Sequence, residues 1–252
     1  MTRQIQVYAD AQELARAAAD EFVRLAGEAV KYRGVFTVAL AGGSTPKSLY
    51  ALLAGDAFRS RVPWEKIHFF WGDERHVAPD HADSNYRMAR EAMLSKVPVP
   101  AENVHRIRSE NPDARRAAEA YETELREFFT SRSLMANNLP RFDLVLLGMG
   151  PDGHTASLFP GTHDVRERER WVAAPWVDKF QTYRVTLTPP VINNAAHILF
   201  FVGGEEKAET LRAVLERAEE NERFPSQVVL PTDGTLCWMV DRAAARLLRT
   251  TS

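Results

Sequence analysis

The sequence has little of several features that define large classes of proteins. Its one cysteine, Cys237, excludes a disulfide within the chain and fits a reducing compartment. The longest apolar runs, 35–41, 142–147 and 198–202, are far shorter than the roughly 18 residues that suggest a membrane span. The amino-terminal MTRQIQVYAD lacks the apolar core of a signal peptide. These absences predict a cytoplasmic protein that does not act in a membrane.

An excess of charge of one sign is also missing. The 32 Lys and Arg residues nearly balance the 34 Asp and Glu residues, for a net charge of −2. A protein whose main partner is nucleic acid or an anionic membrane needs a basic surface. We therefore expect neither partner, although a small anionic ligand stays possible because its site needs only a few local cations.

The composition itself is that of a globular domain. The chain has 252 residues, of which 45% are hydrophobic, enough for a sizeable core. No repeat and no linker rich in Gly, Ser or Pro divides it, so we expect residues 1–252 to form a single domain. Cys237 lies in the apolar run TLCWMV and has no evident partner base, which predicts a buried core residue rather than a nucleophile.

Strand-like and helix-like segments alternate along the chain. Apolar positions at helical spacing predict a helix over 11–33, with Asp10 and Glu13 as a capping box and Gly34 as its stop. The apolar strands lack polar alternation, which is typical of a mostly parallel sheet with helices on both faces, an α/β fold. The predicted strands are 35–41, 66–71, 142–147, 171–177, 183–188, 197–204 and 235–241; the further helices are 46–54, 84–94, 112–130, 189–195 and 205–218.

Four predicted strands end in loops rich in glycine and polar residues. The carboxyl ends of parallel strands meet at one edge of a sheet, where open sheets bind their ligands. We therefore expect the four loops to lie together. They are AGGSTP (41–46), GDERH (72–76), GMGPDGH (148–154) and GGEEK (203–207).

The loop AGGSTP has the features of a phosphate site. Gly42 and Gly43 let the backbone approach a ligand, and Ser44 and Thr45 add hydroxyl groups. A helix predicted to begin at Pro46 would offer free N–H groups, which attract phosphate. The other interpretation is a tight strand-to-helix turn, for which glycine is equally suited.

Further candidates for the binding of an anion lie in other segments. Lys207 falls in the first turn of a predicted helix, where the helix dipole disfavours a cation unless an anion binds or the side chain is in solvent. Arg184, in the strand TYRVTLT, is a second possible phosphate partner, although strand arginines often face solvent. Asn85 follows the expected N-cap Ser84 at a helix start and joins the candidate substrate site.

The loop GMGPDGH combines an acid with a histidine. Gly148, Gly150 and Gly153 permit a sharp turn, and Asp152 and His154 lie two residues apart. An Asp that accepts a hydrogen bond from one imidazole nitrogen fixes the tautomer and leaves the other nitrogen free to act as a base. The pattern predicts a catalytic role for His154, supported by Asp152.

The loop GDERH places charged side chains directly after a strand, poised for a cleft. Asp73 and Arg75 are the candidates, and a solvated loop with an internal ion pair is the alternative. His76 and His81 lie near acidic residues, but their spacing matches no metal-ligand pattern, so we expect no metal. The chain has no GxSxG motif, which disfavours a serine hydrolase.

Together, AGGSTP, WGDERHVAPDHADSNY and FDLVLLGMGPDGHTASLFPG resemble the motifs of the bacterial-type 6-phosphogluconolactonase family. The resemblance covers nearly the whole chain. It implies a modified Rossmann-like, three-layer α/β/α fold and no cofactor. The implied reaction is hydrolysis of 6-phospho-D-glucono-1,5-lactone to 6-phosphogluconate in the pentose phosphate pathway.

Glucosamine-6-phosphate deaminases resemble the chain too, with a GGTP-like loop, an Asp matching Asp73 and a DGH matching residues 152–154. They carry a Tyr in place of Arg75 and a Glu, part of their ring-opening machinery, in place of Phe159. A phenylalanine cannot move a proton, so the lactonase is favoured. A third hypothesis, a non-catalytic sugar-phosphate sensor, predicts an added DNA-binding segment and a lost base, yet His154 is present.

The lactonase hypothesis gives each candidate a role. The phosphate is expected at residues 43–45, with Lys207 and Arg184 as charge partners. His154 takes a proton from water, which attacks the lactone carbonyl, and returns it to the departing ring oxygen. Arg75 is expected to stabilise the oxyanion or hold the lactone, with Asp73 positioning groups around it. The partner is a small molecule, and the protein is expected to be a monomer or a small homo-oligomer without metal or cofactor.

Overall fold

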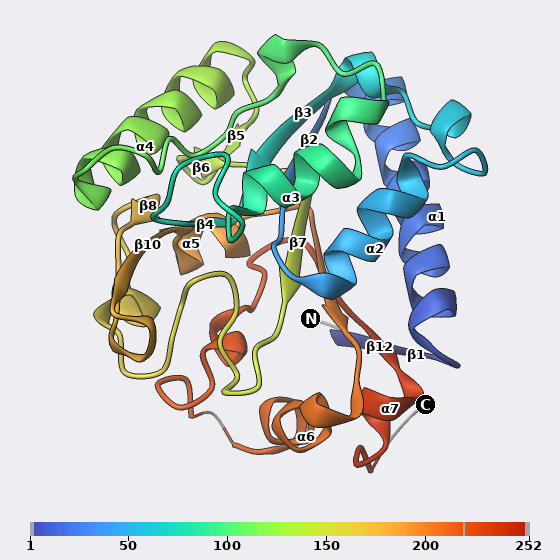
Figure 1. Cartoon of the computed structure of the whole chain (residues 1–252), viewed down its shortest axis with the longest axis vertical. Helices are drawn as coiled ribbons and strands as arrows, with labels where there is room; N and C mark the ends of the chain where they lie inside the picture. The colour runs from blue at the N-terminus through green and yellow to red at the C-terminus, as the bar shows by residue number, and fades with distance from the viewer. Residues whose placement is uncertain (1–2, 219, 250–252) are drawn as a thin grey trace.

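The computed structural model describes residues 3–218 and 220–249. Its centre is a six-stranded sheet in the order β1-β12-β11-β7-β2-β3, in which all neighbouring strands are parallel (Figure 1). Every residue of β2 and β3 is buried, which requires cover on both faces of the sheet. The three-layer α/β/α fold is thus confirmed. The strands are β1 Arg3–Tyr8, β2 Phe36–Leu40, β3 Ile67–Trp71, β7 Leu144–Gly148, β11 His197–Val202 and β12 Thr235–Asp241.

The helices begin and end close to the positions that the sequence predicts. The side chain of Asp10 accepts hydrogen bonds from two N–H groups in the first turn of α1, and Gly34 ends this helix with a φ of 74°. The α-helices are α1 Ala11–Arg33, α2 Ser44–Leu53, α3 Asn85–Ala92, α4 Ala114–Ser131, α5 Pro189–Asn193, α6 Ala208–Glu216 and α7 Arg242–Ala245. Short 3-10 helices are η1 Arg59–Arg61, η2 Trp64–Lys66, η3 Leu94–Lys96, η4 Ala101–Asn103, η5 His163–Arg166, η6 Asp178–Phe180, η7 Glu205–Lys207 and η8 Pro225–Val228.

A second, antiparallel sheet lies beside the end of β3. Its order is β4-β10-β8, and β9 also pairs with β10. The sheet begins only two residues after β3, so it extends the edge at which the loops lie. Its strands are β4 Asp73–Arg75, β8 Val172–Ala173, β9 Trp176–Val177 and β10 Thr182–Leu187, and a separate hairpin joins β5 Met135–Ala136 to β6 Leu139–Pro140.

Some sequence predictions were wrong in detail. The strand expected over 171–177 is two short strands, because Pro175 between them has no N–H to donate. The helix expected from residue 112 begins at Ala114, since Asp113 caps it. The helix expected over 205–218 is η7 followed by the shorter α6. Strand β1 was not predicted, because its exposed, polar residues form no apolar run.

The topology creates a crevice between β2 and β7. From β2 the chain continues to β3 on one side, whereas from β7 it proceeds to β11 and β12 on the other side. The connections therefore diverge between these adjacent strands, and open α/β sheets bind ligands at this point, outside the carboxyl ends. The loops 41–46 and 148–154 leave the sheet here (Figure 1).

The structure also bears on the predictions for Cys237 and for a membrane-spanning segment. Cys237 is buried in β12, as predicted, and burial, with the charge of Glu21, raises the pKa of its thiol to about 11. Among the residues described, no helix has both the length and the apolar character to cross a membrane.

Candidate active site

The loop after β2 forms the amino-terminal end of α2. Gly43 is its N-cap, with a φ of 104° that favours glycine, and no side chain caps the helix. The first N–H groups of α2 thus lack the side-chain partner that a Ser or Asp would supply, as an anion site requires. The helix starts at Ser44 rather than at Pro46, so Ser44 and Thr45 both belong to its first turn.

Two buried tyrosines fix the ends of β2 and β3. The hydroxyl of Tyr50 donates a 2.8 Å hydrogen bond to the carbonyl of Ala41 and accepts one of 2.9 Å from its N–H. Tyr121 bonds in the same way to both backbone groups of Trp71, at 3.1 and 2.9 Å. Sequence reasoning missed both residues, because an aromatic at helical spacing predicts only core packing.

Asp73 lies in a buried hydrogen-bonded network. Its Oδ2 accepts a 2.6 Å bond from the hydroxyl of Ser157, and its carbonyl accepts a 2.9 Å bond from the amide of Asn85. The Asn85 side chain also fills the space beside Gly42. Asp73 and Asn85 therefore connect the loops after β2, β3 and β7, and Ser157 is a member of the site that the sequence did not reveal.

Glu74, next to Asp73, holds the start of α3. Its carboxylate accepts hydrogen bonds from the N–H groups of Asn85 and Tyr86, at 2.7 and 2.8 Å, and from the hydroxyl of Ser84 at 3.0 Å. Burial raises the pKa of Glu74, although these bonds oppose the shift. Glu74 thus stabilises the loop that carries the two neighbouring candidates, Asp73 and Arg75.

Asp152 and His154 form a hydrogen-bonded pair, as the sequence predicted. Oδ1 of Asp152 bonds to Nδ1 of His154, and Oδ2 lies 3.3 Å from Nζ of Lys179. Burial raises the pKa of Asp152, but His154 and Lys179 outweigh it and keep the pKa well below the usual range. An ionised Asp152 accepts Nδ1–H, which leaves Nε2 as the basic nitrogen. No hydrogen bond within the described part of the chain occupies Nε2.

Two neighbouring residues, Gly150 and Phe159, shape the space around the ring of His154. A Cβ atom at Gly150 would lie 2.0 Å from Nδ1 of His154, so only glycine leaves room for the ring. Phe159 stacks on the His154 ring with centroids 4.1 Å apart. The ring of the histidine is therefore held on one face by an apolar side chain.

Arg75 and Arg184 lie opposite each other on neighbouring strands of the second sheet. They are direct partners on β4 and β10. Arg75 donates a 2.7 Å hydrogen bond to the carbonyl of Asp83, and the Arg184 guanidinium lies over the ring of Phe180. Burial and the charge of Arg75 lower the pKa of Arg184. Among the described residues neither guanidinium has a carboxylate ion-pair partner, so the two cations suit an anionic ligand.

Lys207 lies at the end of η7, directly before α6. Burial lowers the pKa of its ammonium group, against the charges of Glu206 and Asp152. The hydroxyl of Thr210, on α6, donates a 2.7 Å hydrogen bond to the carbonyl of Pro151. This contact ties the start of α6 to the loop of Asp152, so Lys207 belongs to the same edge of the sheet.

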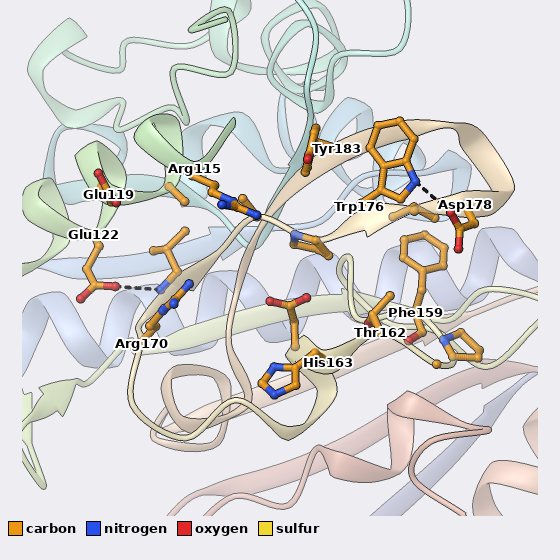
Figure 2. Close-up of a pocket in the computed structure, with 18 of the residues that line it drawn as sticks. Arg115, Glu119, Glu122, Phe159, Thr162, His163, Arg170, Trp176, Asp178 and Tyr183 are labelled. Atoms are coloured by element: carbon orange, nitrogen blue, oxygen red, sulfur yellow. Dashed lines mark hydrogen bonds between the residues drawn. The ribbon is translucent and has the colours of Figure 1, made fainter. Parts of the chain in front are cut away.

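A groove of about 1400 Å³ runs beside the Asp152–His154 pair. Asp152, Phe159 and Lys179 line one part of it, and Arg115 and Glu119 of α4 line another. Figure 2 shows these α4 side chains across the groove from Phe159. Polar walls of this kind suit a hydrated, polar ligand more than an apolar one.

The histidines of the 76–83 loop have other contacts. Nε2 of His76 lies 2.6 Å from the carbonyl of Asn111, and Nδ1 of His81 accepts a hydrogen bond from the N–H of Asp83. Across residues 3–218 and 220–249, no group of three or more His, Cys, Asp or Glu side chains is arranged to hold a metal ion.

The comparison with known proteins agrees with the fold. Residues 9–238 match the model of the family described as glucosamine-6-phosphate isomerases/6-phosphogluconolactonase, and the chain belongs to this family. A 6-phosphogluconolactonase from Nostoc sp. is 41% identical over 97% of this chain and 98% of its own length. One from Synechocystis sp. is 42% identical over 88% of each chain. The structure of 6-phosphogluconolactonase from Trypanosoma cruzi superposes with a TM-score of 0.86 and 30% identity, covering 99% of this chain and 98% of that one.

Proposed function

We propose that this protein hydrolyses 6-phospho-D-glucono-1,5-lactone to 6-phospho-D-gluconate, with His154 as the general base. The observation that carries the proposal is the Asp152–His154 pair at the crevice between β2 and β7. The relatives named 6-phosphogluconolactonase match nearly the whole chain, which supports the lactone as substrate. Phe159 beside His154 supports hydrolysis over deamination, since it cannot move a proton.

The proposed reaction needs one base and one charge-stabilising group. Nε2 of His154 removes a proton from water as the water oxygen bonds to C1 of the lactone. The carbonyl oxygen becomes an oxyanion, which Arg75 is expected to stabilise. The C1–ring-oxygen bond then breaks, and the imidazolium returns its proton to that oxygen. The carboxylic acid product ionises in water.

The phosphate is expected at the start of α2. The uncapped N–H groups near Gly43, Ser44 and Thr45 support this assignment. Arg184 and Lys207 supply positive charge, and burial lowers the pKa of each. Placing the phosphate there would direct the lactone ring toward His154, on the neighbouring loop.

The proposal also covers the pathway, the compartment and the oligomeric state. It places the reaction in the oxidative pentose phosphate pathway of the cytoplasm, with no metal, cofactor or nucleic acid taking part, and with the protein a monomer or a small homo-oligomer. The near balance of charge supports the absence of nucleic acid, and the single cysteine fits a reducing compartment such as the cytoplasm.

The decisive experiment follows acid release from freshly generated lactone, with spontaneous opening subtracted. We expect rapid turnover by the wild type and a loss of about 10²-fold or more in His154→Ala. Wild-type turnover at the background rate would overturn the lactonase assignment, and ammonia release from glucosamine 6-phosphate would then be measured. A fully active His154→Ala variant would overturn only the role of the base.

A further inference from the structure

A short hairpin reaches from the second sheet to the catalytic pair. It comprises residues 176–183, from β9 through η6 to the start of β10. The indole N–H of Trp176 donates a 2.8 Å hydrogen bond to Oδ1 of Asp178, as Figure 2 shows. The tip turns at Gln181, whose φ is 49° and whose amide donates a 2.9 Å bond to the carbonyl of Asp178. These contacts order the tip within the hairpin itself.

Of two adjacent residues of the tip, Lys179 contacts Asp152, and Phe180 contacts Phe159, which stacks on His154. Nζ of Lys179 lies 3.3 Å from Oδ2 of Asp152, the oxygen that His154 does not use. The ring of Phe180 packs edge-on against Phe159 at 5.9 Å, and Phe159 in turn stacks on His154. The tip therefore touches the carboxylate directly and the imidazole through one intervening ring.

We propose that Lys179 is a positioning residue for hydrolysis: its ammonium group holds the Asp152 carboxylate in place against His154. This inference rests on the proposed function, because it assumes that His154 acts as the base. Each oxygen of Asp152 then has a partner: Oδ1 bonds to the imidazole and the N–H of His154, and Oδ2 to the ammonium. A carboxylate held at both oxygens cannot rotate away from Nδ1.

The ammonium charge also affects when His154 can accept a proton. Asp152 alone would stabilise the protonated imidazole, and a protonated ring cannot act as a base. Lys179 partly neutralises that carboxylate, so loss of its charge should favour the protonated ring. The charge of Lys207 also interacts with Asp152, and the neighbouring Glu206 partly neutralises that charge.

The test measures kcat and KM for the lactone from pH 5.5 to 8 in Lys179→Met and Lys179→Arg. Lys179→Met should move the acidic limb of the kcat profile to higher pH by about 0.5 to 1 pH unit. The shift is expected to be this small because solvent screens the charge of the partly exposed Lys179. On the acidic limb, well below its midpoint, kcat should fall about 3- to 10-fold, with KM within about twofold. Lys179→Arg keeps the charge and should restore both properties.

Two controls make the result specific. Lys66→Met removes an exposed lysine at the amino end of β3, opposite the site, and should leave the profile unchanged. In an Asp152→Asn background, Lys179→Met should cause no further change in kcat, since its partner charge is gone.

Several outcomes would overturn the inference. An unmoved acidic limb with a raised KM would show instead that Lys179 contacts the phosphate. An additive loss in the Asp152→Asn background would show that Lys179 acts independently of the carboxylate. Failure of the wild type to hydrolyse the lactone would instead overturn the proposed function itself. The wild-type measurement therefore distinguishes failure of the proposed function from failure of this inference.

Discussion

The imidazole of His154 stacks on the ring of Phe159, with centroids 4.1 Å apart and planes inclined by 26°. Phe159 is buried and therefore a fixed surface for the histidine ring. Together with the hydrogen bond to Asp152, this contact sets the direction of Nε2. The geometry of the proposed base thus depends on an apolar residue as well as on the acid.

Loss of this stacking should reduce turnover without weakening binding. We expect Phe159→Leu to lower kcat about tenfold, because the ring of His154 gains rotational freedom, and to change KM by less than about twofold. The measurement is steady-state lactone hydrolysis at pH 7. Phe58→Leu is the matched control and should retain kcat, because Phe58 is also buried but lies between α2 and η1. A full kcat in Phe159→Leu would show that Asp152 alone orients the base.

Gly150 should tolerate no side chain. In Gly150→Ala the new Cβ would lie 2.0 Å from Nδ1 of His154, so the ring must shift and turnover should fall by about 10²-fold or more. Gly27→Ala is the matched control, because a Cβ there has no neighbour within 4 Å. It should keep full activity and raise the free energy of unfolding by about 0.5–1 kcal/mol, since alanine favours a helix interior. Near-native turnover of Gly150→Ala would show that the pair has room for a methyl group at this position.

The two facing arginines should govern substrate affinity. Arg184→Met should raise KM for the lactone about 10- to 100-fold, the range for loss of a hydrogen bond to a charged group. Inhibition by inorganic phosphate should weaken in parallel. Arg75→Met should lower kcat as well, if Arg75 stabilises the oxyanion. Arg24→Met, which removes an exposed arginine of α1, serves as the control. An unchanged KM would remove Arg184 from the phosphate site.

Stability at mildly acid pH should depend on His68, far from the Asp152–His154 pair in sequence. Burial, with the charges of His105 and Arg132, lowers the pKa of His68 to about 4. In the unfolded chain this histidine takes up its proton near pH 6.5, so the unfolded state binds more protons between these values. The folded protein should therefore lose about 1–3 kcal/mol as the pH falls from about 6.5 toward 4.

Urea unfolding at pH 7 and at pH 4.5 checks this prediction. His68→Phe places an uncharged ring beside Phe128 and should reduce the loss of stability between the two pH values. His81→Gln, at an exposed histidine, should leave the loss unchanged. Equal losses in the wild type and His68→Phe would show that other groups cause the acid sensitivity.

The sequence by itself determined the layered fold and the chemistry of the loops. Strands buried on both faces are mostly apolar, and that local pattern is readable, as is the N-cap of α1 at Asp10. The Asp152–His154 pair was also predictable, because two residues of one tight turn need no distant partner. Strand β1 was missed because an exposed edge strand needs no apolar run.

Only the tertiary structure decided which distant residues meet in the site. The bond from Ser157 to Asp73 joins positions 84 residues apart, and Arg184 faces Arg75 through antiparallel pairing of two short strands. Lys179 reaches Asp152 through a hairpin whose tip carries no periodic pattern. Such contacts follow from how elements pack, and packing depends on the whole chain, whereas capping, turn formation and burial patterns depend on neighbours in sequence.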